Sequence, residues 1–475
     1  MTRKLALAFA ALALSGCMVG PAYHRPDVPL PTSYPEALPA EKATAARDEL
    51  PADWWTLFGD PTLDDLVQSA LANNRDIQLA VARIEEANAN VRAVNAAFLP
   101  EVDVTAGAAR AAIPQATAIN GASVSNSLRL GLASAFEVDF WGKLRSGAQA
   151  ARSLALASRD AADVVRLTTA GLTAQTYFAV RALDSQIATT EATLGIRSEA
   201  LGLVRRRADA GVASDLDVAQ SEGTRADAAA QLKELVRQRA IALHALGILT
   251  GRLDVALDRG DLMKLPDPAL PPPGLPSTLL TRRPDIRQAE EQLVAANARI
   301  GVTRADMFPT ISLTAALGVA SPALASIIDT PNRTWSIGGN LLGPLFDAGR
   351  RAALTEAEEA RMRQALVNYQ QVVERSFREV ADALATVRQA AASEADQADR
   401  VRAANQALRL ANLRYEAGYS AFLEVLDAQR TKNDAELALI RNRQTLLAAD
   451  VDLMRALGGG WSPTTGLAAA QPISR

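Results

Sequence analysis

Side chains that commonly carry acid–base, nucleophilic or metal chemistry are scarce in this sequence. Its 475 residues include two histidines, His24 and His244, and a single cysteine, Cys17. One cysteine cannot form a disulfide within the chain, and two histidines far apart in sequence make neither a zinc cluster nor a Cys–His catalytic pair. The sequence also lacks a GxxxxGKS or GxxxxGKT loop for nucleotide phosphates. We therefore expect no catalytic residues, no metal and no soluble cofactor, and a hydrolase is the remotest alternative.

Cys17 nevertheless stands where its thiol could react. Residues 1–16 begin with the basic pair Arg3 and Lys4, continue with an apolar run of ten residues and end in two small residues. This pattern is typical of a signal peptide, and the run is too short for a transmembrane helix. The LSGC sequence resembles a bacterial lipobox, which predicts cleavage before Cys17, a covalent lipid on Cys17 and a lipid-anchored N-terminal segment over 17–60. An ordinary signal peptide with an incidental cysteine is the alternative.

Near the C-terminal end, one apolar and two acidic side chains have helical spacing. Leu423 and Asp427 are four residues apart and Glu424 and Asp427 are three apart, so all three can face one side of a helix. Carboxylates are also favourable near a helix start because of the helix dipole alone. The pattern is therefore compatible with a functional site or with a plain solvated face.

An internal repeat positions these residues. Residues 76–100 align with 285–309 at an offset of 209, and after residue 142 the offset is 207, which matches Gly211 with Gly418. A duplicated unit this long predicts two similar halves rather than a solenoid of small repeats. The predicted parts are repeat 1 over 61–251, a Pro-rich connector over 252–276, repeat 2 over 277–458 and a C-terminal tail over 459–475.

Each repeat is predicted to contain one long helical hairpin, over 142–250 in the first and 349–457 in the second. Gly211 and Gly418 should form the hairpin tips, because glycine readily takes the left-handed backbone that ends a helix. Two shorter helices stacked end to end are long enough to lie antiparallel to the first helix of each hairpin. In the first helix of the first hairpin, apolar and small polar residues alternately three and four positions apart indicate a coiled-coil seam. They are Leu183, Ile187, Thr190, Leu194, Arg197, Leu201 and Val204.

Alternating apolar and polar residues predict two strands in each repeat. They span about 101–113 and 127–140 in the first, and about 310–320 and 334–346 in the second. Tilted strands of about this length can cross a bilayer, although a soluble half-buried sheet shows the same alternation. Four strands cannot close into a barrel, so a membrane barrel must be shared between chains. Two chains would supply eight strands without a channel and three would supply twelve.

Six motifs occur in one order along almost the whole chain: CMVGPAYHRP (17–26), WWTLFGDPTLDDLVQSALANNRDI (54–77), FLP (98–100), DFWGKLR (139–145), LFDAGR (345–350) and RYEAGYSAFLEVLDAQR (414–430). Together they resemble the TolC-like outer membrane factors, specifically the lipoprotein branch of multidrug efflux channels, the NodT-type family. The resemblance implies an α+β membrane protein that is a homotrimer. Its twelve-stranded outer-membrane β-barrel would continue into a twelve-helix periplasmic α-barrel, with the connector in an equatorial region.

The resemblance also implies a periplasmic gate. Leu423 would close the pore by apolar contact, while Glu424 and Asp427 would form carboxylate rings. Such rings need nearby partners, cations or water, because like charges repel at short range.

A latch and two docking tips are implied as well. Asp217 and Tyr415 match positions that tie the two hairpins together in the closed state. The arginine that completes this latch in some members is Ser420 here, which implies a weaker or different latch. The tips at Gly211 and Gly418 would contact the adaptor protein.

The function implied is that of a passive exit duct, the outer membrane channel of a tripartite efflux system for drugs or other small solutes. Its partners would be a periplasmic adaptor (membrane fusion) protein, an inner-membrane efflux transporter and outer membrane lipid. The chain would be lipid-anchored in the cell outer membrane and extend into the periplasm. With 50 basic and 53 acidic residues, the net charge of −3 offers no basic field for nucleic acid. The alternative is a pore-less periplasmic coiled-coil adaptor or scaffold lipoprotein, which would lack paired amphipathic strands.

Overall fold

The computed structural model describes residues 18–34, 50–113, 123–268 and 279–460. The chain divides into two compact units. Unit 1 comprises Met1–Asp27, Arg83–Arg159 and Gln288–Gln370, and unit 2 comprises Val28–Ala82, Asp160–Arg287 and Gln371–Arg475. Cys17, the predicted signal peptide and the tail after Gly460 lie outside the described residues.

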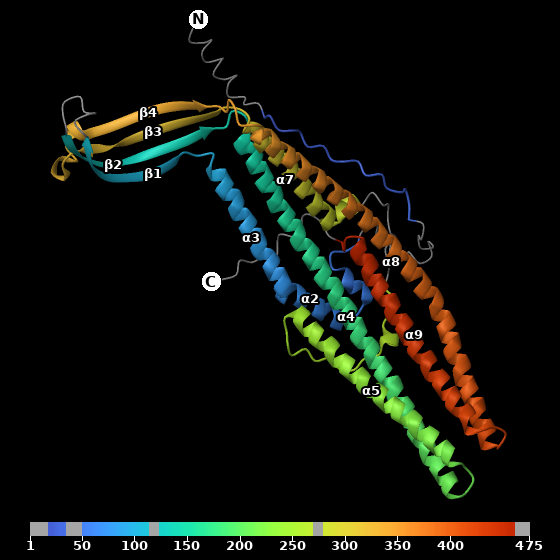
Figure 1. Ribbon diagram of the computed structural model, residues 1–475. Helices are drawn as coiled ribbons and strands as arrows, with labels where there is room; N and C mark the ends of the chain where they lie inside the picture. Colours follow the sequence, from blue (N-terminus) through green and yellow to red (C-terminus); the bar gives the residue numbers. More distant parts are fainter. Residues whose placement is uncertain (1–17, 35–49, 114–122, 269–278, 461–475) are drawn as a thin grey trace. The chain divides into compact units, whose positions relative to one another are not determined.

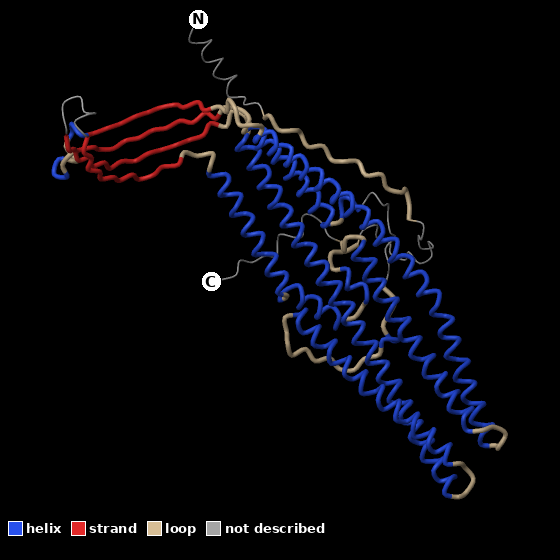
Figure 2. The backbone as a smooth tube through the Cα atoms, viewed as in Figure 1, coloured by secondary structure: helices blue, strands red, loops and turns tan. Residues whose placement is uncertain are grey.

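One antiparallel sheet forms the β part of unit 1 (Figures 1 and 2). Its strands follow in chain order: β1 (Glu101–Ile113), β2 (Ser123–Val138), β3 (Thr310–Ser321) and β4 (Arg333–Leu342). The register aligns Val104, Leu132, Leu317 and Trp335 in one row across all four strands. Directly opposed side chains share a face, so this row makes one face apolar, and Trp335 is 75% exposed on it. The adjacent row, on the other face, is small and polar: Thr105, Gly131, Gly318 and Thr334.

Two strand ends differ from the predicted ones by four residues, and three others differ by one or two. β2 begins at Ser123 instead of 127, because residues 123–126 pair with the end of β1. β4 ends at Leu342 instead of 346, because Gly343 is followed by Pro344, which has no N–H to donate to a ladder. Side-chain alternation predicts the middle of a strand better than its ends, which depend on backbone pairing.

Small residues let the backbones of unit 1 approach closely. Ala150 of α4 (Lys143–Asp209) is buried with Ala295 and Ala298 of α7 (Pro284–Ala305). The N-terminal segment contacts α7 at Gly20, where a Cβ would lie 2.9 Å from the Cα of Gly301. These contacts bring segments that are far apart in the sequence together.

Helices make up most of the part of unit 2 that the structure describes. The long hairpins pair α4 with α5 (Asp215–Thr250) and α8 (Arg350–Glu416) with α9 (Phe422–Ala456) (Figure 1). The predicted seam residues of α4 are buried or half-buried, and Ile187, Thr190 and Val204 have no exposed surface. No helix of the described residues is both long and apolar enough to span a bilayer. The other helical elements of unit 2 are η1 (Trp54–Phe58), α2 (Pro61–Asn73), η2 (Leu262–Lys264) and α6 (Leu279–Arg282). α3 (Arg75–Ala96) runs from unit 2 into unit 1, and η4 (Leu324–Ser326) and η5 (Thr330–Asn332) belong to unit 1.

The described part of the connector, 252–268, is fastened to α4 and α5. The Arg239 guanidinium donates to the carbonyl oxygen of Leu257 at 2.8 Å. The amide of Leu262 donates to Ser185 Oγ at 2.9 Å, and the Leu262 side chain is fully buried. Hydrogen bonds to helix side chains therefore hold this extended segment in place.

Candidate functional site at the helix tips

The two hairpins of unit 2 end in turns of the same design. Gly211 and Gly418 both have a left-handed backbone, with φ of 73° and 77°. The amide of Val212 donates to the carbonyl of Arg207 and that of Tyr419 to the carbonyl of Arg414, each at 2.8 Å. This six-residue closure is a Schellman motif, and its left-handed residue is best supplied by glycine. Both predicted tip glycines thus lie at exposed hairpin tips.

An apolar cluster joins the two hairpins just behind these turns. It contains Val204 of α4, Ala411 of α8, and Phe422, Val425 and Leu426 of α9, all buried. Val218 of α5 packs against the same cluster. Burial of these side chains holds the four helix ends together.

Two aromatic rings and a guanidinium form the edge of this cluster. The rings of Tyr415 and Phe422 have centroids 5.1 Å apart. Arg207 Cζ lies 4.8 Å from the Tyr415 ring centroid, a cation–π geometry. Sequence reasoning missed Phe422 and Arg207. The spacing of Phe422, Val425 and Leu426 is an apolar helical pattern that could have revealed Phe422, but a contact between helices such as that of Arg207 leaves no local signal.

The predicted gate residues lie together on the exposed side of α9. Leu423 is 58% exposed, and Glu424 and Asp427 are also exposed, while Phe422, Val425 and Leu426 point into the cluster. The spacing argument for one shared side therefore agrees with the structure.

Each gate carboxylate has an arginine neighbour in the same chain. Arg430 donates to Asp427 Oδ1 at 2.6 Å, and Arg414 Nε lies 3.3 Å from Glu424 Oε1. The hydrogen bond from Arg430 to Asp427 raises the pKa of Arg430. Both pairs are exposed, so they contribute little to stability, but they compensate the negative charge of this face.

Asp217 and Tyr415, the predicted latch, have different partners in this chain. Asp217 Oδ2 accepts from the Ser214 amide at 3.1 Å, and the Asp217 amide donates to Ser214 Oγ at 3.2 Å. These bonds form a capping box at the start of α5. Within the described residues no hydrogen bond joins Asp217 to Tyr415. Ser420 Oγ is buried and has no hydrogen-bond partner among those residues.

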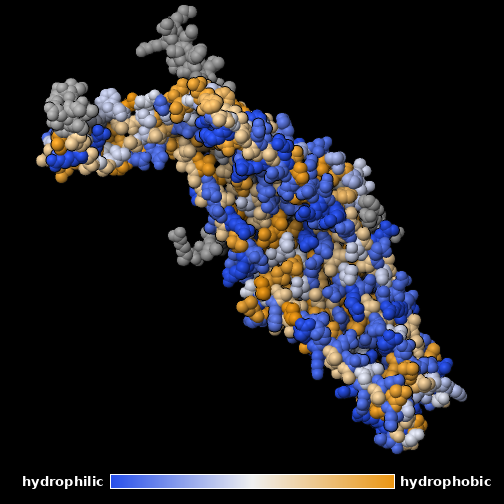
Figure 3. All heavy atoms as spheres, viewed as in Figure 1, coloured by the Kyte–Doolittle hydropathy of each residue, from blue (hydrophilic) through white to orange (hydrophobic). Residues whose placement is uncertain are grey.

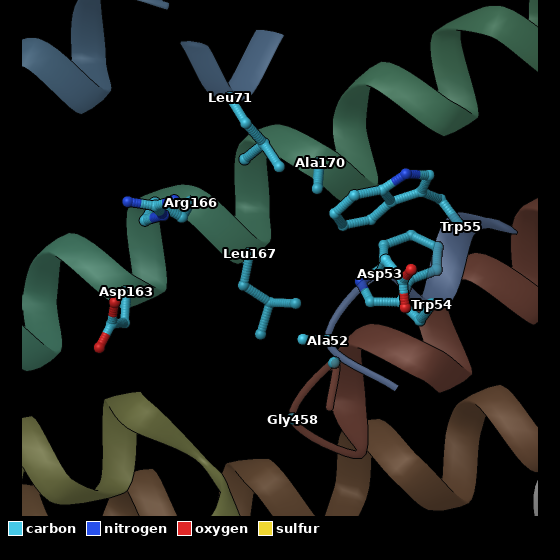
Figure 4. A pocket seen from close by; sticks show the side chains of 11 residues that line it. Ala52, Asp53, Trp54, Trp55, Leu71, Asp163, Arg166, Leu167, Ala170 and Gly458 are labelled. Atoms are coloured by element: carbon cyan, nitrogen blue, oxygen red, sulfur yellow. The ribbon is translucent and has the colours of Figure 1, made fainter. Parts of the chain in front are cut away.

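A separate cavity of about 510 Å³ in unit 2 is walled by aromatic and aliphatic side chains (Figure 4). Trp54, Trp55, Leu71 and Leu167 face it, and Arg166 of α4 lies at its edge. Its lining residues include no histidine, cysteine or serine. Among the described residues we find no cluster of His, Cys, Asp and Glu that could hold a metal ion.

Comparison with known proteins decides the family. Residues 66–252 and 275–459 match the family described as outer membrane efflux protein. The chain belongs to the outer membrane efflux protein family. The resemblance inferred from the six motifs is thereby confirmed.

Relatives of this outer membrane efflux protein match it over nearly its full length. It is 37% identical to outer membrane protein OprJ of Pseudomonas aeruginosa over 95% of this chain and 94% of that protein. It is 34% identical to the probable efflux pump outer membrane protein TtgC of Pseudomonas putida, over 99% and 98%. The crystal structure of the Campylobacter jejuni CmeC outer membrane channel superposes with a TM-score of 0.88 at 26% identity, covering 94% of this chain and 96% of that one. The protein is thus an efflux channel of the outer membrane with a TolC-like fold.

Proposed function

We propose that three copies of the chain form the passive exit duct of a tripartite efflux system. The observation that carries the proposal is the four-stranded sheet of unit 1, which has an apolar exposed face and edge strands β1 and β4. An open edge in lipid leaves backbone N–H and C=O groups unpaired at a cost of several kcal/mol each. Joining β4 of one copy to β1 of the next removes every edge, and three copies give a barrel of twelve strands.

The helical hairpins would continue this barrel into the periplasm as a tunnel of twelve helices. We assign the periplasmic gate to Leu423, Glu424 and Asp427, with Leu423 closing the pore and the two carboxylates setting its charge. Asp217 and Tyr415 are assigned to the latch between hairpins, and the tips at Gly211 and Gly418 to adaptor docking. Exposure of all three gate side chains and the exposed position of both tips support these assignments.

Cargo would be delivered by an inner-membrane efflux transporter through a periplasmic adaptor protein. A duct of this kind needs no catalytic residue and no cofactor, and the only covalent group proposed is a lipid on Cys17. Relatives are named for the efflux of antibiotics, toluene and cations. For this chain we propose drugs or other small solutes as cargo.

A full-length Cys17→Ser variant separates the duct from a pore-less scaffold lipoprotein. As a duct, the variant should stay in the outer membrane fraction and need detergent for extraction, because the sheet and not the lipid holds it there. Native mass spectrometry of the extract should then show trimers. A variant that is soluble without detergent, or that is a folded monomer in mild detergent, would contradict the proposal.

A further inference from the structure

Two arginines lie on the apolar face of the sheet, one on each edge strand. Arg110 is six residues after Val104 on β1, and Arg333 is two residues before Trp335 on β4. Because successive side chains of a strand alternate between its faces, both arginines share the face of Val104 and Trp335. Both are exposed. A guanidinium on a face that is proposed to contact lipid needs an anionic partner or the polar level of the membrane.

The described residues offer these two charges no carboxylate partner. Neither side chain takes part in an ion pair or hydrogen bond within that part of the chain. The sequence gives the reason, because residues 104–136 contain no aspartate or glutamate and residues 307–346 contain only Asp329. Asp329 is close to Arg333 in sequence but forms no ion pair with it. Both guanidiniums are therefore uncompensated positive charges within one copy of the chain.

The junction proposed between β4 of one copy and β1 of the next restricts where these arginines lie. β4 has 10 residues and β1 has 13, and the strand order makes the two antiparallel. Pairing the whole of β4 with β1 therefore leaves four registers, and two of these put the apolar residues of one strand on the polar face of the other. In the two remaining registers Arg333 lies opposite Arg110 or opposite Ala112 of the next copy.

In both of these registers the two guanidiniums are neighbours across the junction. Cβ atoms directly opposite in an antiparallel pair are about 5 Å apart, and diagonal ones about 7–8 Å. Like charges this close destabilise a strand pair, so an anion between them would offset the repulsion. Arginine suits this role, because its planar fork donates two hydrogen bonds to one phosphate.

The arginines lie at the end of the sheet that is not connected to the long helices. β1 ends at Ile113, β4 begins at Arg333, and η4 and η5 lie between β3 and β4 at this end. Figure 3 shows strongly hydrophilic residues beside hydrophobic ones there. Trp335 is 75% exposed on the same face and belongs to the residue types that concentrate at membrane interfaces. The face continues with three exposed leucines, Leu130, Leu132 and Leu317.

We propose that each junction between copies binds a phosphate of an anionic lipid of the outer leaflet, held between Arg110 of one copy and Arg333 of the next. The acyl chains lie along the apolar face, and a ring of three copies has three such sites. The site rests on the proposed function, because the two arginines meet only when β4 and β1 of different copies pair. A lipid fits better than a free phosphate, since apolar side chains such as Leu317 continue from the arginines along the same face.

Native mass spectrometry of the delipidated full-length trimer tests the proposal with diphosphoryl lipid A as the probe. Arg110→Gln and Arg333→Gln should each lower its retention about tenfold, as the loss of a hydrogen bond to a charged group predicts. Arg129→Gln is the matched control, because Arg129 is an exposed arginine of β2 on the polar face of the same sheet. This control should retain the lipid as the parent does. Equal retention by the parent, Arg110→Gln and Arg333→Gln proteins would overturn the proposal.

An excess of inorganic phosphate distinguishes the two sources of the anion. Diphosphoryl lipid A should remain bound to the parent trimer in phosphate, because its acyl chains contribute to binding. Complete displacement of the lipid would show a simple anion site and refute the lipid assignment.

Cross-linking separates a failure of the lipid site from a failure of the duct. In a Cys17→Ser background, Arg110→Cys combined with Arg333→Cys places two thiols at each junction, and a short bismaleimide should join the three copies covalently. Either cysteine alone should leave the copies separable on a denaturing gel. Cross-linked trimers whose parent retains lipid no better than the glutamine variants would refute the lipid site alone and leave the duct intact. Trimers without cross-links would show that the two arginines are not neighbours and would refute the site through its geometry.

Discussion

The side-chain amide of Asn74 donates a hydrogen bond of 2.9 Å to the carbonyl oxygen of Leu249. This bond joins the start of α3 to the end of α5. The predicted repeat aligns Asn74 with Arg283, whose guanidinium donates to the carbonyl of Ala456 at 3.0 Å. Each long helix hairpin is thus tied to the shorter helix stacked on its end, by a different residue type making the same contact.

Removing the Arg283 side chain should lower the unfolding free energy more than removing that of Asn74. Arg283 is buried, and besides Ala456 it contacts Asp285 and Glu379 at 2.7 Å each. Arg283→Ala leaves these carboxylates unpaired and a helix-end carbonyl unsatisfied, so we expect a loss of about 3 kcal/mol of unfolding free energy. Hydrogen exchange of residues 279–290 and 450–458 should report the loss. The exposed Arg375→Ala on α8 is the control, and equal exchange in both variants would contradict the expectation.

Tyr177 should make the stability of unit 2 fall at high pH. Its side chain is fully buried, and its hydroxyl donates to Asp60, which also caps α2 through the Thr62 amide. Burial and the hydrogen bond to Asp60 raise the pKa of Tyr177 to about 12. The unfolded tyrosine loses its proton near pH 10, so this stabilisation is complete below pH 10 and is lost as pH rises to about 12.

Thermal unfolding followed by circular dichroism between pH 9 and 12 measures this effect. The melting temperature should decline in that window, and Tyr177→Phe should flatten the decline without abolishing it. Part of the decline in melting temperature remains in this variant because burial also raises the pKa of Tyr34 to about 12. The same pH slope in the parent and Tyr177→Phe proteins would show that Tyr177 makes no such contribution.

The exposed face of α9 should control the pore. Leu423→Ala with Asp427→Ala is expected to raise the single-channel conductance in planar bilayers, because it removes bulk from the proposed constriction. Glu424→Ala with Asp427→Ala should lower cation preference, since it leaves Arg414 and Arg430 without their carboxylate neighbours. Asp215→Ala, an acidic residue in the first turn of α5, is the matched control. Parental conductance and selectivity in both double variants would favour a plain solvated face.

Cys17→Ser should abolish acylation. The thiol is the proposed site of the diacylglycerol, so metabolic labelling with radioactive fatty acid should mark the parent protein and not the variant. Insertion into the outer membrane should continue in the variant. Label that persists after substitution would place the lipid elsewhere or show that the label is adventitious.

Local chemistry explains which features the sequence could predict. The hairpin tips follow from Gly211 and Gly418, because the left-handed backbone of a Schellman turn favours one residue type. The shared side of Leu423, Glu424 and Asp427 follows from helical spacing alone. Ser214 and Asp217 fit a Ser-x-x-acid pattern at a helix start, which predicts the capping box locally, whereas the resemblance implies a latch role for Asp217.

Contacts between elements explain the rest. The Arg207–Tyr415 contact and the hydrogen bond from Arg283 to Ala456 bring together residues that are distant in sequence. Nothing in either local segment specifies the partner. The early start of β2 depends on pairing with β1 rather than on its own alternation. The apolar pattern around Phe422 was present but was hidden by the acidic residues beside it.

Single-channel recording of the purified full-length protein in planar lipid bilayers tests the duct most directly. Three chains that close a barrel and tunnel should produce discrete conductance steps, and their size should increase in the Leu423→Ala, Asp427→Ala variant. A protein that inserts into the bilayer yet produces no steps above the bare membrane, in either form, would contradict the proposal that this chain builds an exit duct.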